Sequence, residues 1–101
     1  MEITLFKKKT DEYTRYWASV STEKTNKKGK GTGEYIRASL PVRLSNKAAE
    51  SLEDSWTETK NDAISYVRIT VKDCWFKAAE SAESEPFVVL FVNACKVIEE
   101  D

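Results

Sequence analysis

Residues 34–56 have the sequence EYIRASLPVRLSNKAAESLEDSW, and the hydrophobic period of this stretch changes halfway along. In its first half every second residue is apolar, as on a strand with one buried face; these residues are Ile36, Ala38, Leu40 and Val42. In its second half the apolar residues recur every four positions, as on one face of a helix; these are Leu44, Ala48, Leu52 and Trp56. Ser45 stands where a helix N-cap is expected. The stretch therefore predicts a strand followed directly by a helix.

Strands are also predicted on both sides of this stretch. Residues 2–8 alternate weakly between apolar and polar types, and residues 13–22 are rich in the aromatic and β-branched types that strands favour. After the helix, residues 63–76 alternate again, and Trp56 and Trp75 are expected to belong to the core. Residues 87–98 form a nearly continuous apolar run, which predicts a strand covered on both faces.

Two segments between these strands are predicted to be loops. Residues 23–33 contain three glycines and four lysines with no apolar anchor, so we expect a flexible hairpin loop. Residues 78–85 are acidic and precede Pro86, so we expect a second loop there.

The predicted order is three strands, one helix and two strands. This order is that of an OB-like barrel, which is an all-β fold of five strands with one helix (β-β-β-α-β-β). In such a barrel the helix closes one end, and the apolar stripe that begins at Leu44 suits that role. A twisted antiparallel sheet with the helix on one face and an SH3-like barrel are the alternative architectures.

Composition limits the class of protein. A chain of 101 residues with 41% hydrophobic and 33% charged residues suits a single domain over residues 1–101 with one core. The longest apolar run, residues 87–92, is far shorter than the roughly 20 residues of a membrane-spanning helix, so no membrane association is expected. Cys74 and Cys95 have no nearby Cys or His, and no signal-peptide pattern follows Met1, so we expect a reduced, cytoplasmic protein.

Catalysis is not expected from these residues. The chain contains no histidine, which removes Ser-His and Cys-His nucleophile pairs and the commonest general base. The acidic residues fall on a polar helix face and in a polar loop, where burial would not tune their pKa for acid-base work. No calcium-loop, nucleotide-loop or zinc pattern is present, so we expect no metal and no cofactor. A carboxylate hydrolase stays open only if two acids are buried together in a cleft.

A Tyr-x-Arg triplet occurs on three predicted strands and is the clearest candidate for a site. Residues two apart in a strand share a face, and in the third and fourth strands this face lies opposite the aliphatic one. In the second strand Trp17 follows Tyr13 and Arg15 at the same two-residue spacing. The candidate residues are Tyr13, Arg15, Trp17, Tyr35, Arg37, Tyr66 and Arg68.

This combination is typical of surfaces that bind single-stranded nucleic acid, because rings stack on bases while basic groups follow the phosphates. The lysines of the predicted loop add sequence-independent attraction; they are Lys24, Lys27, Lys28 and Lys30. Residues 7–9 are also lysines and extend the same path. The structural alternative is that Tyr and Arg simply stabilise the sheet through cross-strand contacts, at about 0.2–1 kcal/mol per pair.

On these residues the chain resembles the OB-fold single-stranded DNA-binding proteins of phages and mobile elements. The resemblance covers nearly the whole chain and rests on element order, the outward aromatic and arginine residues and the basic loop. It implies a non-catalytic protein of DNA replication or recombination whose partner is single-stranded DNA, with RNA as the alternative. Members of that family often recruit partners through an acidic C-terminal tail, of which residues 99–101 are only a stub.

A protein-interaction or assembly module is the second hypothesis, and it uses the same exposed aromatic face. Tyr, Trp and Arg are preferred anchors of protein interfaces. Residues 1–50 carry 11 basic against 6 acidic residues, and residues 51–101 carry 5 against 11, so the halves have net charges of +5 and −6. Opposite charges of this kind could pair between subunits, which leaves a homo-oligomer open.

Overall fold

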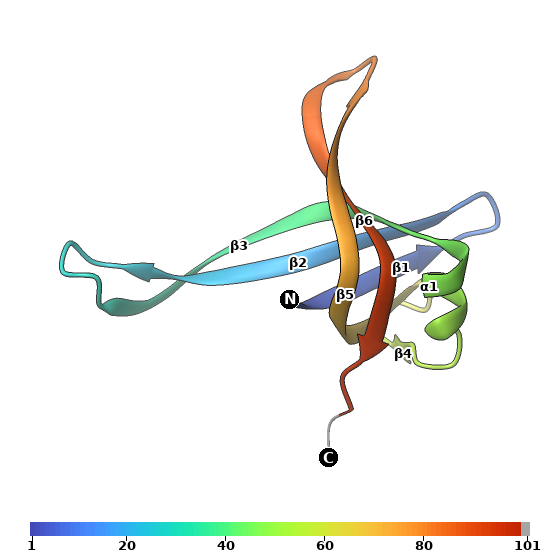
Figure 1. The fold of residues 1–101 in the computed structure, drawn as a ribbon, viewed down its shortest axis with the longest axis horizontal. Coiled ribbons are helices and arrows are strands. Elements are labelled where there is room, and N and C mark those ends of the chain that lie inside the picture. Colours follow the sequence, from blue (N-terminus) through green and yellow to red (C-terminus); the bar gives the residue numbers. More distant parts are fainter. Residues whose placement is uncertain (100–101) are drawn as a thin grey trace.

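The sequence of residues 34–56 forms a strand and a short helix in the computed structural model, which describes residues 1–99 (Figure 1). The elements in chain order are β1 (Glu2–Lys9), β2 (Thr14–Thr25), β3 (Gly31–Leu44), α1 (Asn46–Ser51), β4 (Thr57–Glu58), β5 (Ile64–Ser81) and β6 (Ser84–Val97). Apart from β4, a two-residue strand in a stretch that the sequence predicts as a connection, the predicted order is confirmed.

Five of these strands close into a barrel. β1 pairs with β2 on one side and with β5 on the other, so the order runs β1-β2-β3-β6-β5 and returns to β1. All of these pairs are antiparallel except β3 and β6, which run parallel over Val42–Leu44. The β1–β5 pairing rules out an open twisted sheet. The predicted all-β barrel with one helix is thus confirmed.

Strand β5 bends and pairs with two different strands along its length. Its first half pairs with β1, and its second half pairs with β6. The register with β6 shifts around Asp73, as it does at a β-bulge, which bends a strand and increases its twist. The Asn93 side-chain amide donates a hydrogen bond to the Asp73 carboxylate at 2.9 Å and ties the bulge to β6.

One apolar core fills the barrel. Its eleven buried members come from all five barrel strands and from the α1 segment: Ile3, Leu5, Ala18, Val42, Ala48, Leu52, Val67, Ile69, Val71, Leu90 and Val92. Among the side chains that the structure describes, no polar or charged one is buried. The buried side chains of the core therefore stabilise the barrel through apolar burial.

The helix closes one end of the barrel but is shorter than its apolar stripe suggests. It covers six residues, and the stripe places Ala48 and Leu52 in the core while Leu44 ends β3 and Trp56 follows the helix. Asp54 and Ser55, which follow Leu52 and Glu53, favour turns over further helix. The predicted cap is confirmed, since the Ser45 hydroxyl accepts the N–H of Ala48 at 3.1 Å.

Ser45→Ala is expected to lower the free energy of unfolding by about 0.5–2 kcal/mol, because it removes this cap. The same hydroxyl donates to the Asn93 carbonyl at 3.1 Å, so the substitution also loosens the helix from β6. Chemical denaturation followed by circular dichroism measures the change. Ser21→Ala, at an exposed position of β2, serves as the control and is expected to change stability by less than about 0.5 kcal/mol.

Two long hairpins extend beyond the barrel, and both differ from the sequence-based expectation. β2 and β3 pair as far as Thr25 and Gly31, so the loop predicted over 23–33 is a turn at 26–30 on an ordered ladder. β5 and β6 pair as far as Ser81 and Ser84, so the loop predicted over 78–85 is a tight turn. The hairpins raise the radius of gyration to 15.4 Å, against about 13 Å for a compact domain of this length.

Both hairpins leave the same end of the barrel, opposite α1. Because β3 and β6 are parallel where they meet, their N-terminal portions extend in the same axial direction, while α1 follows the C-terminal end of β3. Beyond the barrel the two hairpins diverge, as Figure 1 shows. We call them the β2–β3 hairpin and the β5–β6 hairpin.

Side-chain hydrogen bonds explain why the turn of the β2–β3 hairpin is ordered despite its polar composition. The Asn26 side-chain oxygen accepts the backbone N–H groups of Lys28 at 2.8 Å and Lys30 at 3.0 Å. Gly29 lies between them with φ of 79°, a conformation that favours glycine. An Asn and a Gly thus supply the turn geometry.

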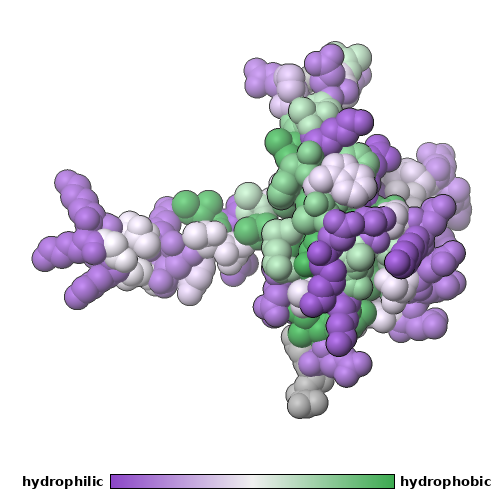
Figure 2. Space-filling model, in the orientation of Figure 1, coloured by the Kyte–Doolittle hydropathy of each residue, from purple (hydrophilic) through white to green (hydrophobic). Residues whose placement is uncertain are grey.

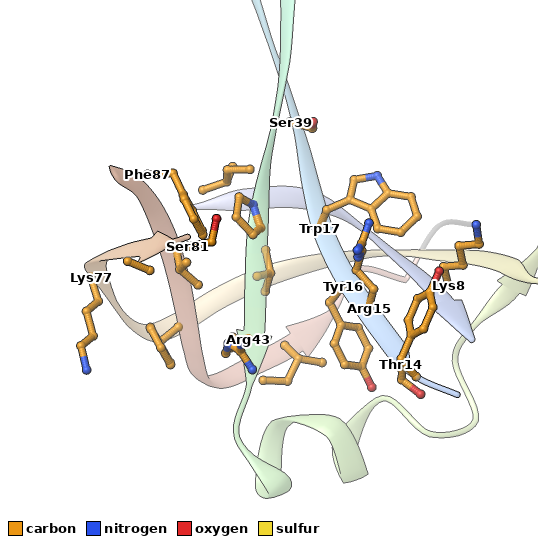
Figure 3. A pocket seen from close by; sticks show the side chains of 18 of the residues that line it. Lys8, Thr14, Arg15, Tyr16, Trp17, Ser39, Arg43, Lys77, Ser81 and Phe87 are labelled. Atoms are coloured by element: carbon orange, nitrogen blue, oxygen red, sulfur yellow. The ribbon is translucent and has the colours of Figure 1, made fainter. Parts of the chain in front are cut away.

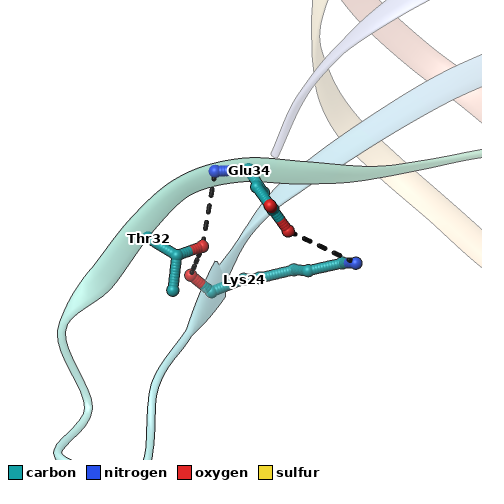
Figure 4. Close-up of polar contacts among 3 residues, drawn as sticks. All are labelled: Lys24, Thr32 and Glu34. Atoms are coloured by element: carbon teal, nitrogen blue, oxygen red, sulfur yellow. Dashed lines mark hydrogen bonds and ion pairs between the residues drawn. The ribbon is translucent and has the colours of Figure 1, made fainter.

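Further contacts fix the hairpin behind the turn (Figure 4). The Thr32 hydroxyl donates to the Lys24 carbonyl at 3.0 Å and accepts the N–H of Glu34 at 3.3 Å. The Lys24 ammonium lies 3.8 Å from the Glu34 carboxylate. At Gly31 an added Cβ would meet only the carboxylate end of the exposed Glu23 side chain, which can move aside.

Candidate nucleic-acid interface

A wide, open groove of about 1230 Å³ lies on the outer side of the barrel, between β2 and the β5–β6 hairpin (Figure 3). It crosses four strands, which at about 4.8 Å per spacing is roughly 14 Å. The side chains that matter most are Arg15 and Trp17 from β2, Ser39, Pro41 and Arg43 from β3, and Lys77, Phe87 and Phe91 from the β5–β6 hairpin. Small-molecule pockets usually measure about 300–1,000 Å³ and enclose their ligand, whereas this groove is open to solvent.

Strand register brings the groove residues together. Trp17 is opposite Pro41 in the β2–β3 pairing, and Arg43 is beside Phe91 in the parallel β3–β6 pairing. Each of these residues is one position away from a core residue, such as Ala18 or Val42, so it faces outward by strand alternation. The groove is therefore built on paired strands.

Aromatic contacts hold the rings along the groove. The Trp17 indole is stacked on Phe6 of β1, with ring centroids 5.6 Å apart and an angle of 10° between planes. Phe6 in turn lies 6.3 Å from Tyr66 of β5. On the other side of the groove Phe91 is stacked on Trp75 at 5.5 Å and 2°. Rings packed in this way lose little further conformational freedom when a ligand stacks on them.

Trp75 differs from the sequence-based expectation that it belongs to the core. The residue is 49% exposed, and Phe76 beside it is 59% exposed. The bend and extension of β5 carry both residues beyond the barrel interior, where no second layer covers them. Trp56 behaves as expected, because it is partly buried against the core.

The groove is locally basic although the chain has a net charge of −1. Four basic side chains line it, Lys8, Arg15, Arg43 and Lys77, against one acidic residue, Glu80. The Arg15 guanidinium also lies 5.5 Å from the centre of the Tyr13 ring, within cation–π range. A polyanion is attracted by the local surface, so the overall charge does not oppose binding.

The structure divides the Tyr-x-Arg series into three places. Tyr13, Arg15 and Trp17 line the groove. Tyr66 and Arg68 lie on the same outer face but on the far side of β1, opposite Phe6 and Thr4. The three pairs therefore do not form one compact patch.

Tyr35 and Arg37 lie far out on the β2–β3 hairpin. They are opposite Glu23 and Ser21, so Tyr35 is about 20 Å from Trp17 at roughly 3.3 Å per residue. Tyr35 is 56% exposed. The four predicted lysines are farther still, at the end of this hairpin; they are Lys24, Lys27, Lys28 and Lys30.

Several groove residues were not identified from the sequence. Arg43 continues the outward alternation of Tyr35, Arg37 and Ser39, so the spacing could have revealed it. Phe87 and Phe91 were hidden in an apolar run that suggested a strand covered on both faces. In the structure Leu90 and Val92 face the core, whereas Phe87, Val89 and Phe91 face the groove.

Lys7 lies on the opposite side of β1 from the groove residues. Its ammonium is 4.4 Å from the centre of the Trp56 ring, and the Tyr16 ring is 6.0 Å from the same indole. Desolvation by burial, with a smaller contribution from Lys9, lowers the pKa of Lys7, and burial raises the pKa of Tyr16. Of the three consecutive lysines, Lys8 is the one that reaches the groove.

Within residues 1–99, no three His, Cys, Asp or Glu side chains are grouped closely enough to hold a metal ion. No helix in that part of the chain has the length and apolar character needed to cross a membrane. Cys74 and Cys95 are free thiols, and burial raises the pKa of Cys95.

Comparison with protein-family models, with curated protein sequences and with solved structures gave no match to this chain.

Proposed function

We propose that the chain is a non-catalytic domain of the OB-fold type that binds single-stranded nucleic acid, most readily single-stranded DNA, in the groove between β2 and the β5–β6 hairpin. The observation that carries the proposal is the joint placement of rings and cations in one open groove. Trp17, Phe87 and Phe91 alternate there with Arg15 and Arg43.

The chemistry of a single strand matches this groove. Unpaired bases offer an aromatic face to Trp17 or to the Phe91–Trp75 stack, and each such contact contributes about 1–3 kcal/mol. The phosphates between the bases are attracted to Arg15, Arg43 and Lys77. Bases in a duplex are already stacked and present only their edges, so the same groove disfavours duplex DNA.

The lack of buried polar groups supports a binding role without catalysis. Acid-base catalysis needs a group whose pKa is tuned by burial or by a close partner. Among the described side chains none that is polar or charged is buried, and the one acid that lines the groove, Glu80, is exposed.

Titration with labelled oligo-dT tests the proposal. We expect dissociation constants in the micromolar range or tighter, quenching of Trp emission, and affinity that falls with salt. Oligo-rU of equal length distinguishes RNA from DNA, and a hairpin duplex of equal charge is the control for simple charge attraction. Absence of binding at low salt, or equal affinity for the duplex, would contradict the proposal.

Changing Lys24, Lys27, Lys28 and Lys30 together to Gln is expected to weaken oligo-dT binding modestly while leaving Trp quenching at saturation unchanged. These lysines are exposed and distant from the groove rings, so they supply attraction without stacking. The slope of log Kobs against log salt should become shallower by about 0.7 for each phosphate that the variant no longer neutralises. Lys47→Gln with Lys60→Gln, at exposed positions in α1 and before β5, is the control for lysines away from the hairpin.

A further inference from the structure

Each of the two hairpins has one apolar side that is exposed to solvent. This side continues, beyond the barrel, the side of the strands that faces the core. On the β2–β3 hairpin Val20 is 44% exposed and Ile36 is 56% exposed, and on the β5–β6 hairpin Phe76 is 59% and Val88 is 51% exposed. Val20 follows the core residue Ala18 by two positions. Figure 2 shows hydrophobic surface along both hairpins, where they leave the barrel.

The ends of the two hairpins carry opposite charge. Residues 24–30 include four lysines and no acidic residue, whereas residues 80–85 include three glutamates and no basic residue. Because the hairpins diverge, the two ends do not meet within one chain (Figure 1). Each end therefore presents a net charge to the surroundings, next to an apolar strip, although Lys24 of the basic end is paired with Glu34.

We propose that this end of the barrel binds a second copy of the same chain, with the β2–β3 hairpin of each copy packed against the β5–β6 hairpin of the other. In this dimer Val20 and Ile36 cover Phe76 and Val88 of the partner, and the lysine-rich end meets the glutamate-rich end. A two-fold axis makes the same contact twice, as in most homodimers.

Charge complementarity favours a second copy over an unrelated partner, because every copy supplies one basic end with four lysines and one acidic end with three glutamates. The dimer also leaves the groove open. Phe87 and Trp17 face the groove, while their sequence neighbours Val88 and Ala18 face the other side, since alternate residues of a strand point in opposite directions. Self-association and base stacking thus use different faces of the same strands, whereas the lysines of the β2–β3 hairpin and Glu80 contribute to both surfaces.

Sedimentation analysis of charge-reversed variants without nucleic acid tests this inference. One variant carries K24E, K27E, K28E and K30E, and the other carries E80K, E83K and E85K. Each variant alone has two like-charged ends, so we expect its dimer to dissociate at least about tenfold more readily than that of the natural chain. An equimolar mixture restores both attractive contacts, so we expect dimers to reappear as a one-to-one pair of the two variants.

Two further variants separate the apolar contribution from charge. Ile36→Asp and Phe76→Asp are at exposed positions, so they are expected to shift the chain to monomers that stay folded, as circular dichroism would show. Lys47→Glu with Lys60→Glu, which reverses two exposed charges away from both hairpins, is the control and should leave the dimer unchanged. A natural chain that stays monomeric over about 1–200 µM, or variants that fail to pair when mixed, would overturn the inference. Oligo-dT binding is measured separately, so a monomer that binds it refutes only the dimer.

Discussion

Trp17→Ala is expected to weaken binding of oligo-dT by about 5- to 150-fold, which corresponds to the loss of about 1–3 kcal/mol from one stacked base. Trp17 is the largest ring on the β2 side of the groove, and its stacking on Phe6 fixes its position. Fluorescence anisotropy at fixed salt measures the dissociation constants of the variant and the natural chain. Because alanine removes a ring but no charge, the salt slope should stay the same.

Two further variants test whether oligo-dT binds in the groove or on the β2–β3 hairpin. Arg43→Glu is at an exposed position of β3 in the groove, so it should weaken binding at least about tenfold and make the salt slope shallower, without unfolding the chain. Tyr35→Ala removes an exposed ring of the β2–β3 hairpin, about 20 Å from Trp17, and should have a smaller effect. If Tyr35→Ala weakened binding more than Trp17→Ala, the centre of binding would lie on the hairpin, in contradiction to the groove.

Leu52→Ala is expected to lower the free energy of unfolding by about 2–5 kcal/mol. Leu52 is fully buried at the end of α1 and fills the barrel end that the helix closes. The free energy of unfolding of a domain is about 5–15 kcal/mol in total, so this loss is a large part of it. Because each kcal/mol corresponds to about 4–8 °C in a domain of this size, the melting temperature should fall by roughly 10–40 °C. Thermal unfolding followed by circular dichroism gives the value.

Ile36→Ala is the matched control for this substitution, because it also shortens a branched aliphatic side chain but at a position that is 56% exposed. We expect a change of less than about 0.5 kcal/mol there, measured on chain dilute enough to be monomeric. Equal losses at Leu52 and Ile36 would mean that the β2–β3 hairpin is packed against the barrel, which conflicts with its position in the structure.

The barrel itself could be predicted from the sequence because its elements obey local rules. The alternation before Val42 and the four-residue spacing of Ala48 and Leu52 both follow from one buried face, and the structure buries all three residues. Ser45 was identifiable because an N-cap needs a short side chain that accepts a hydrogen bond.

The length of the two hairpins could not be predicted in the same way. The lysines and glycines around Asn26 have low strand propensity, and the acidic residues around Glu83 resemble a loop in composition. Both segments are ordered by pairing with the opposite strand, which depends on partner residues rather than on the segment's own composition. A prediction from local composition therefore made the strands of both hairpins too short.

The candidate site was predicted only in part for a related reason. Strand alternation correctly gave the outward direction of Arg15 and Trp17, but which residues lie side by side depends on register. The register places Arg43 beside Phe91, a contact between distant parts of the sequence, and leaves Tyr35 far from Trp17. Register is set by the whole barrel and cannot be inferred from a single strand.

Mapping of oligo-dT contacts by NMR tests the central claim most directly. In a titration of the isotope-labelled chain, we expect the largest chemical-shift changes at the Trp17 indole N–H and at the amides of Arg43 and Phe91. Smaller changes are expected at the lysines of the β2–β3 hairpin and none around α1. Saturable shifts centred on the groove would agree with the account. Shifts centred on Tyr66 and Arg68, or no shifts in the groove while the oligonucleotide binds, would contradict it.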